Sequence, residues 1–368
     1  MILDEVALTF VPNLGTRGIS HLTDIYEDAS AIYGATEHHL ACVAELRRDI
    51  IAHITQRAGY SEAERELRYC EQHNIGVTSY HDNLYPPLLR EVADRPHILY
   101  SMGDIGVLQS KHILSVVGTR RISTYGQSVC IRLLTELAEM FPDLVVVSGL
   151  AFGVDATAHH TAISAGVKTV AIVPSKLPEV TPTQHSRLAE EIVDEGGAII
   201  SELNSQSKQN GAYYIPRNRI IAGVAEGLWV VESPANGGSL STAKAADGYS
   251  RTVVATPGRI TDSRSEGTNH LIKTNVAQLI TSARDIASAL GWKEVGAMPE
   301  KIHFAPRQFT PKEKMVYDAI ANNSDGLTID SIADKTGLAV SEVSAILLNM
   351  ELSGLALQQP GRRYVICL

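Results

Sequence analysis

The chain has 368 residues, of which 44% are apolar, and its net charge is −9. This length allows two or three domains with hydrophobic cores. The negative charge excludes a protein that binds polyanions over its whole surface, so any nucleic-acid site must be a local gathering of positive charge.

The cysteines and the N-terminal residues indicate the compartment. The four cysteines lie far apart and form no Cys-x-x-Cys pair, which argues against a zinc site and a disulfide framework. Asp4 and Glu5 stand where a secretory signal carries basic residues, and no apolar run approaches the roughly 18 residues that span a membrane. We therefore expect a cytoplasmic protein with no membrane contact, no metal and no cofactor.

Residues 1–80 are dominated by helical periodicity and predict a small helical domain of SAM or helix-hairpin-helix type. Within it, the segment Leu14–Ile19 is bounded by glycines, as in hairpins that offer backbone N–H groups to a DNA phosphate. A plain connection between two helices explains the segment equally well, because Arg17 is the only cation nearby.

Residues 81–290 change to short β-branched runs that alternate with helical patterns. Continuous apolar strands separated by helices predict a Rossmann-like parallel sheet covered on both faces. Ligands of such sheets bind at the carboxyl ends of the strands. The predicted strands are Ile113–Val117, Leu144–Val147, Thr169–Val173, Ala198–Ser201, Leu228–Val231 and Thr252–Ala255.

Small, hydroxyl-bearing and basic residues follow these strands and form two candidate anion-binding sites. In one, Pro216 opens a helical pattern beside two arginines, where backbone N–H groups are free. In the other, a glycine turn precedes a helix N-terminus. The candidate phosphate ligands are Gly118, Thr119, Arg120, Ser148, Gly149, Arg217, Asn218, Arg219, Gly237, Gly238, Ser239 and Thr242.

Common nucleotide motifs are absent from the sequence. There is no G-x-x-x-x-G-K-[ST] loop, and residues 148–153 do not form G-x-G-x-x-G, which argues against ATP hydrolysis and a standard dinucleotide fold. Asp155 and His159 are spaced to meet across one helical turn, which we interpret as fixing the start of the helix. We expect structural roles for His159 and His160, because neighbours on a helix point to different faces.

The C-terminal region is predicted to be a winged helix behind a linker at residues 291–308. From residue 309 to 368 it has five basic and seven acidic residues, and the would-be recognition helix carries no Lys or Arg. We therefore expect it to serve protein contacts or regulation. Its predicted elements are helices at 311–321, 328–335 and 340–352 and strands at 355–357 and 364–367.

Several motifs, in one order and spacing, resemble the DNA-processing protein A (DprA/Smf) family. The resemblance implies an extended Rossmann-like fold that binds single-stranded DNA, acts as a homodimer, and loads the RecA recombinase during natural transformation without catalytic turnover. The motifs are Val117–Arg120, Ser148–Ala151 with Gly153–Asp155, Pro216–Gly223, Gly238–Leu240 with Thr242–Ala243, and Thr256–Gly258 with Gly267–Asn269.

The sequence departs from the family at three places on the predicted rim. Phe152 stands where the family is usually basic, His160 replaces an arginine, and the usual glycine turn and Tyr-Pro pair are replaced by residues 174–182. We expect Phe152 to offer a face to a base, although packing under the helix explains it equally well. Lys176 and Arg187 are expected to restore part of the lost charge.

Two other functions remain open. One is a nucleotide-like small-molecule binding protein or a phosphoribohydrolase-type enzyme on a related fold, which would need a glutamate shortly after the glycine turn. Here the first carboxylate after that turn is Asp247. The other is a repressor-type duplex reader that uses the winged helix.

Overall fold

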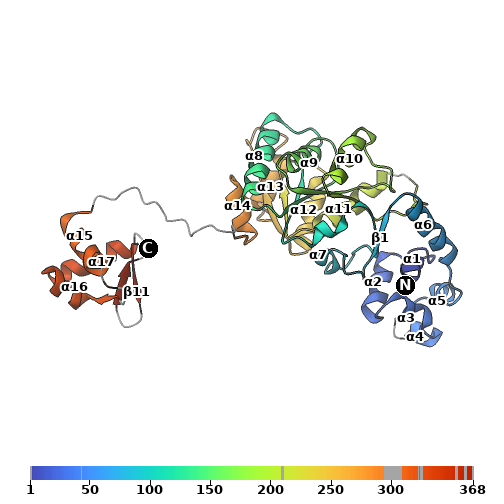
Figure 1. Cartoon of the computed structure of the whole chain (residues 1–368), viewed down its shortest axis with the longest axis horizontal. Helices are drawn as coiled ribbons and strands as arrows, with labels where there is room; N and C mark the ends of the chain where they lie inside the picture. Colours follow the sequence, from blue (N-terminus) through green and yellow to red (C-terminus); the bar gives the residue numbers. More distant parts are fainter. Residues whose placement is uncertain are drawn as a thin grey trace. The chain divides into compact units, whose positions relative to one another are not determined.

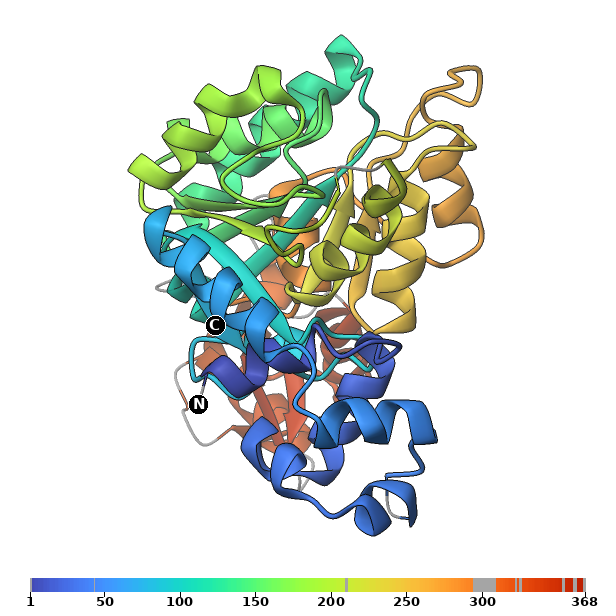
Figure 2. The same ribbon diagram turned by 90° about the vertical axis from the view of Figure 1, so that its right-hand side faces the viewer.

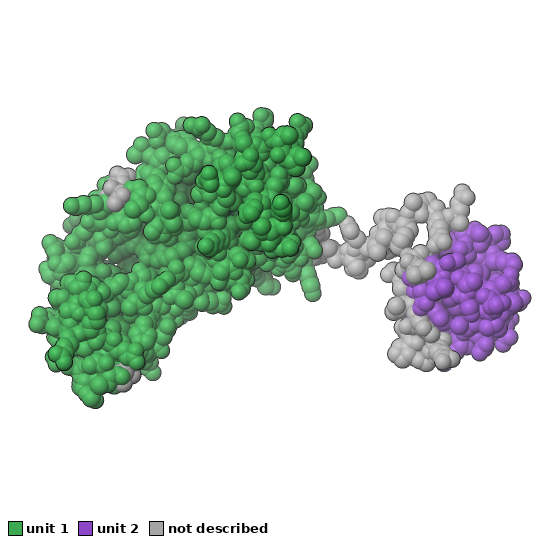
Figure 3. All heavy atoms as spheres, turned by 180° about the vertical axis from the view of Figure 1, so that it is seen from behind, with its two compact units in different colours: residues 1–295 green, residues 296–368 purple. Residues whose placement is uncertain are grey.

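The structure is a computed structural model that describes residues 2–42, 44–208, 211–293, 309–321, 323, 326–352, 355–359 and 363–366. The chain divides into two units, residues 1–295 and 296–368, which are coloured separately in Figure 3. Most of the predicted linker, from residue 294 to 308, lies outside the described residues. Within the described part, no helix combines the length and apolar character that a membrane crossing requires.

The first unit is built on a sheet whose nine described strands run in the order β1-β2-β6-β5-β4-β3-β7-β8-β9 (Figures 1 and 2). The pairings from β6 through β9 are parallel, whereas β2 pairs antiparallel with both β1 and β6. The six predicted strands correspond to β3–β8, and the predicted fold class is confirmed. The strands are β1 Gly76–Ser79, β2 Ile98–Gly103, β3 His112–Val117, β4 Leu144–Ser148, β5 Lys168–Ile172, β6 Ala198–Ser201, β7 Gly227–Val230, β8 Thr252–Ala255 and β9 Gln278–Leu279.

Helices cover both faces of this sheet, so the central strands are apolar on both sides. On β3, Ile113 packs into one hydrophobic cluster with Ile220, and the next residue, Leu114, packs into another with Leu133. The helices around the sheet are α7 Pro87–Arg90, α8 Thr124–Met140, α9 Val154–Ser164, α10 Ser186–Asp194, α11 Tyr214–Gly223, α12 Ser239–Gly248, α13 Glu266–Lys273 and α14 Ala283–Ala289.

The strand order reverses between β3 and β7. From β3 the chain proceeds outward through β4, β5 and β6, and it then returns to place β7 on the other side of β3. Connections on the two sides of such a switch point diverge and leave a crevice at the carboxyl ends of the strands. The crevice here therefore lies between the segments that follow Val117 and Val230.

One of the contacts that join the N-terminal helices to the antiparallel edge of the sheet is the buried carboxylate of Glu5. Glu5 of α1 lies 3.0 Å from Nδ1 of His81 and 2.7 Å from Nε2 of His97, which flank β1 and β2, and it accepts the Ala29 N–H at 3.2 Å. The described helices of this segment are α1 Ile2–Leu8, α2 Thr16–Ile25, α3 Ala29–Gly34, α4 Glu37–Cys42, α5 Arg48–Thr55 and α6 Tyr60–Gln72.

The glycine-bounded segment Leu14–Ile19 connects two of these helices, because Gly15 is the residue before α2. Leu14 and Ile19 are both buried in the helical core, so much of the segment is used for packing. The turn also lines a cavity of about 220 Å³ that it shares with residues from β2 and with Glu202. A carboxylate in this position opposes the binding of a phosphate there.

The second unit has the predicted winged-helix plan. Its three helices begin and end within one residue of their predicted bounds, and a short strand, β10, completes a sheet in the order β10-β12-β11. The elements are α15 Pro311–Ala321, β10 Leu327–Thr328, α16 Ile329–Thr336, α17 Val340–Leu352, β11 Ala356–Gln359 and β12 Arg363–Ile366. Glu342 at the start of α17 is paired with Lys312 at 2.7 Å.

Candidate functional site

A cavity of about 230 Å³ opens at the switch point, and we call it the switch-point cavity. It joins the segment after β3, the start of α11 and the glycine turn before α12, which are separate in the sequence. The carboxyl ends of β3 and β7 therefore form one site, as the sequence predicted for a parallel sheet. Its lining includes Gly118, Thr119, Arg120, Ala151, Asp155, Tyr214, Ile215, Arg217, Asn218, Pro234, Gly237, Gly238, Ser239 and Thr242.

The glycine turn presents the start of α12 to this cavity. The Gly237 N–H donates to the carbonyl of Pro234 at 3.0 Å, and the Ser239 hydroxyl donates to the hydroxyl oxygen of Ser233 at 2.9 Å. The N-cap residue of α12 is Gly238, which has no side chain that could cap the helix, and the N–H groups of Leu240 and Ser241 donate to the carbonyls of Gly237 and Gly238. The start of the helix lines the cavity and adds the positive potential of its dipole to it.

Arg120 is the exposed cation of the cavity. Its guanidinium carbon lies 4.9 Å from the ring centroid of Tyr214, within the range of a cation–π contact. Across the described ranges of the chain, no carboxylate forms an ion pair with this guanidinium. Arg120 is thus held in place by an aromatic ring and keeps its charge available to a ligand.

Glu232 fixes the loop that carries Arg120. Its backbone carbonyl accepts the Thr119 N–H at 2.7 Å, and its carboxylate accepts the N–H and hydroxyl of Ser123 at 2.8 and 2.6 Å. These three hydrogen bonds tie both ends of the loop to the segment after β7. The carboxylate of Glu232 is therefore used to hold the loop.

Arg217 is buried beneath the cavity, where 6% of the residue is exposed. Its Nη1 donates to the carbonyls of Gly149, at 2.8 Å, and Ile172. A β-carbon at Gly149 would lie 2.7 Å from the guanidinium, so a side chain there would displace the guanidinium from its position. Burial lowers the pKa of Arg217 to about 10 despite the attraction of Asp155, and burial raises the pKa of the Asp155 carboxyl.

Arg219 lies outside the cavity, although it is only two residues away. Its guanidinium makes two hydrogen bonds to the carboxylate of Glu202, at 2.8 and 2.6 Å, and a third to the carbonyl of Asp94 at 2.8 Å. Residues two apart on a helix point in different directions. The structure therefore separates the two arginines that the sequence grouped as one cradle.

The remaining predicted ligands are also engaged with protein groups. The Ser148 hydroxyl donates to the carbonyl of Val116 at 2.6 Å. Lys176 is 3.5 Å from Glu179, and the exposed Arg187 is 3.2 Å from Glu191. None of these three residues lines the switch-point cavity.

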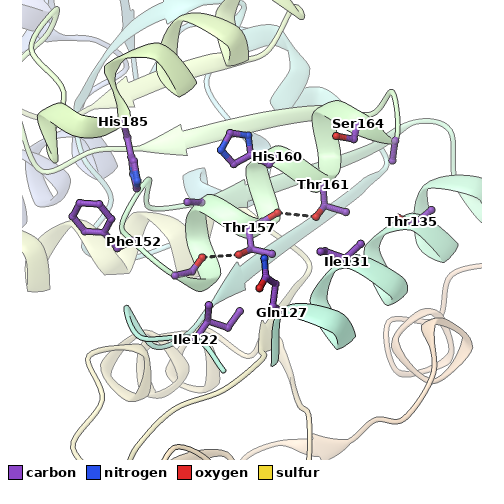
Figure 4. Close-up of a pocket in the computed structure, with 13 residues that line it drawn as sticks. Ile122, Gln127, Ile131, Thr135, Phe152, Thr157, His160, Thr161, Ser164 and His185 are labelled. Carbon is purple, nitrogen blue, oxygen red and sulfur yellow. Dashed lines mark hydrogen bonds between the residues drawn. The ribbon is translucent and has the colours of Figure 1, made fainter. Parts of the chain in front are cut away.

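Phe152 lies at the end of a groove of about 530 Å³ between α8 and α9 (Figure 4). The residue is 45% exposed, and its ring centroid is 4.6 Å from that of His185 in an edge-to-face arrangement. His185 is oriented by a contact of 2.7 Å between its Nδ1 and the carbonyl of Leu150, which requires a proton on Nδ1. The pair leaves an aromatic surface accessible to a base.

We expect Phe152→Ala to weaken binding of single-stranded DNA by roughly 1 to 3 kcal/mol, the usual contribution of one stacked base. The melting temperature should change little, because the side chain is half exposed. Fluorescence anisotropy with a labelled oligonucleotide measures the first quantity and calorimetry the second. A large fall in melting temperature with unchanged affinity of the folded protein would assign Phe152 to packing.

Tyr214, Ile215 and Asp155 line the cavity but were not among the predicted ligands. Tyr214 and Ile215 directly precede Pro216. The sequence signal that could have identified Tyr214 as a lining residue was an aromatic residue next to the predicted phosphate-binding turn. Ile215 is 72% exposed, which no periodicity in the sequence indicates.

His159 is buried and its Nδ1 lies 2.7 Å from the Thr169 hydroxyl, in agreement with the expected structural role, whereas Asp155 interacts with the Ala151 N–H.

Comparison with known proteins agrees with this architecture. Residues 76–291 match the family described as DNA recombination-mediator protein A, and residues 303–362 match the DprA winged helix domain. The chain belongs to the DNA recombination-mediator protein A family. This confirms the resemblance that the motifs indicated.

Three relatives illustrate the family. Protein Smf of Escherichia coli (strain K12) is 33% identical over 81% of this chain and 79% of its own length. The X-ray structure of DNA processing protein A from Streptococcus pneumoniae superposes on this chain with a TM-score of 0.67 and 28% sequence identity. The superposition covers 78% of this chain and 98% of the Streptococcus pneumoniae chain. DNA processing protein A from Helicobacter pylori, whose structure concerns its binding of single-stranded DNA, has a TM-score of 0.52 and 28% identity over 59% of this chain and 95% of its own.

Proposed function

We propose that this chain binds single-stranded DNA at the switch-point cavity and loads the RecA recombinase onto DNA that enters the cell in natural transformation. One observation carries the DNA-binding part of the proposal. The exposed Arg120, held on Tyr214, faces the same cavity as the start of α12. Two sources of positive potential thus converge on one cavity in a chain of net charge −9.

The proposed site has a contacting part and a supporting part. Arg120, Gly237 and Gly238, together with Gly118, Thr119, Asn218, Ser239 and Thr242, line the cavity and contact the phosphates. Arg217, Gly149 and Ser148 support the edge of the sheet beneath them. Because such contacts are made to the backbone of the strand, we infer binding with little sequence preference.

The remaining parts of the proposal follow from family membership. We infer that the protein acts as a cytoplasmic homodimer, that it binds RecA, and that it performs no catalytic turnover. The structure supports the last inference at one point: the carboxylate nearest the end of β7, Glu232, already accepts two hydrogen bonds from Ser123. A general base needs a carboxylate that can reach the substrate.

One observation favours the alternative of a nucleotide-like ligand or phosphoribohydrolase-type chemistry. Asp155 lines the cavity, and burial raises the pKa of its carboxyl, a property that is common in active sites. Its Oδ2 accepts the Ala151 N–H at 3.3 Å, however, and it is electrostatically coupled to the buried Arg217. These contacts favour a structural role.

The test compares binding of single-stranded DNA, duplex DNA and mononucleotides at two salt concentrations. We expect Arg120→Ala to weaken binding of every single-stranded sequence alike and to reduce the slope of log K against log salt by about 0.7, the value for one phosphate contact. Arg68→Ala, which removes an exposed arginine on α6, is the matched control. Wild-type affinity and slope in Arg120→Ala would refute the assignment, and tighter binding or cleavage of a mononucleotide would favour the enzyme.

A further inference from the structure

A second hollow, of about 620 Å³, lies beside the switch-point cavity. Its walls are Ser123–Tyr125 at the start of α8 and the loop of residues 257–265 between β8 and α13. We call it the Tyr125 cleft. Its volume lies within the range of ligand sites and exceeds that of the switch-point cavity.

The loop wall of the cleft is braced at its base. The Gly258 N–H donates to Oδ1 of Asn269 at 3.1 Å, and Nδ2 of Asn269 donates to the Gly258 carbonyl at the same distance. A β-carbon at Gly258 would collide with the side chain of Ser265, so this packing requires a glycine. The wall is therefore fixed without any ligand.

The cleft combines an accessible aromatic ring with a cation. Tyr125 is 51% exposed, and its hydroxyl donates to the Pro257 carbonyl at 2.9 Å, which anchors the ring across the cleft. Arg259 on the facing loop is exposed, and no carboxylate of the described residues pairs with it, although Asp262 also lines the cleft. Grooves that bind single strands without sequence preference combine aromatic faces with positive charge in this way.

Glu232 and Ser233 form hydrogen bonds to both the Tyr125 cleft and the switch-point cavity. Glu232 holds both Thr119, which lines the cavity, and Ser123, which lines the cleft. The Ser233 hydroxyl oxygen accepts the hydroxyl of Ser239 at the cavity, and its carbonyl accepts the Gly267 N–H in the first turn of α13. The loop of residues 118–123, with Arg120 and Arg121, thus separates two adjoining sites.

We propose that the Tyr125 cleft is a second subsite for single-stranded DNA, which binds the nucleotides next to those in the switch-point cavity. Tyr125 stacks on a base and Arg259 contacts a phosphate. A strand that passes over the loop of residues 118–123 meets Arg120, Arg121 and Arg259, and finds an aromatic ring on the far side. This inference rests on the proposed function of the cavity and extends it to a longer strand.

The test uses the full chain and oligothymidylates of about 4 and about 16 nucleotides, the range of site sizes for single-strand binding folds. We expect Tyr125→Leu to weaken binding of the longer strand about fivefold or more and to leave the shorter strand unaffected. Tyr125→Phe, which keeps the ring but loses the hydrogen bond to Pro257, should bind the longer strand more tightly than Tyr125→Leu does. Arg259→Ala should reduce the salt slope of the longer strand by about 0.7, and Arg68→Ala should change neither.

A crosslinking experiment tests the contact directly. A longer strand with photoreactive 5-iodouracil along its length should crosslink to the peptide that contains Tyr125 in the wild-type protein. Wild-type binding by Tyr125→Leu and Arg259→Ala, with crosslinks at other peptides only, would overturn the inference. If Arg120→Ala weakens both strands in the same experiments, the proposed function stands without the cleft; if the wild-type chain binds neither strand, the proposed function itself fails.

Discussion

Replacing Arg217 with alanine is expected to lower the free energy of unfolding of the first unit by about 2 to 5 kcal/mol, because each buried acceptor that loses its donor costs roughly 1 to 3 kcal/mol. The substitution leaves the carbonyls of Gly149 and Ile172 without their donor and removes the cation that attracts buried Asp155. Urea unfolding followed by tryptophan fluorescence measures this loss. Trp229 and Trp292 both lie in the first unit, so the signal reports on that unit.

Two further variants separate the roles of Arg217. Arg217→Met combined with Asp155→Asn removes both charges and should recover part of the lost stability. The control Arg68→Ala should change stability by less than about 0.5 kcal/mol. If Arg217→Ala unfolds like the wild type but binds DNA more weakly, Arg217 contacts phosphate directly and the supporting role assigned to it is wrong.

Glu5→Gln is expected to lower the free energy of unfolding at neutral pH by about 3 kcal/mol, because Glu5 joins α1 to both His81 and His97 within a buried cluster. The amide keeps the size of the side chain and an acceptor for the Ala29 N–H. It removes the negative charge. His39→Gln, in the exposed pair with Tyr26, is a matched control that should have little effect.

The same cluster predicts how stability depends on pH. Burial would raise the pKa of Glu5, but hydrogen bonds from His81 and His97, and their charges, outweigh burial and hold that pKa well below its ordinary value of 4.5. The stabilisation by Glu5 is therefore complete above pH 4.5 and is lost as the pH falls toward the folded pKa. Glu5→Gln should flatten the fall in stability below about pH 5; an equal fall in both proteins would contradict this account.

The sequence predicted the central sheet well because its strands are buried on both faces. Runs such as Ile113–Val117 and Leu144–Val147 are continuously apolar and separated by helical patterns, a combination typical of parallel sheets. Strands β1 and β2 were not predicted. Gly76–Ser79 is short and has only two buried residues, and Ile98–Gly103 is interrupted by Ser101, so neither run stands out from its surroundings.

Many of the predicted ligands line the switch-point cavity, but the contacts of the arginines were not predicted. The glycines and Arg120 were found because parallel strands bring their carboxyl ends to one edge. The directions of Arg217 and Arg219 depend on acceptors that are distant in sequence, such as Ile172 and Glu202. Neither partner is marked by a motif, so the sequence suggested a shared role for two side chains that the fold directs to different places.

The attachment of the loop of residues 118–123 to Glu232 also bears on the kinetics of binding. A loop that is already ordered in the free protein loses little conformational entropy when a ligand arrives. Binding of the strand then requires no conformational change of the loop, so diffusion and charge determine the association rate. Variants of this rim that keep its charge should accordingly differ in the dissociation rate of the complex, and variants that remove an arginine should also lower the association rate. Loss of the Glu232 hydrogen bonds to the loop should slow association as well.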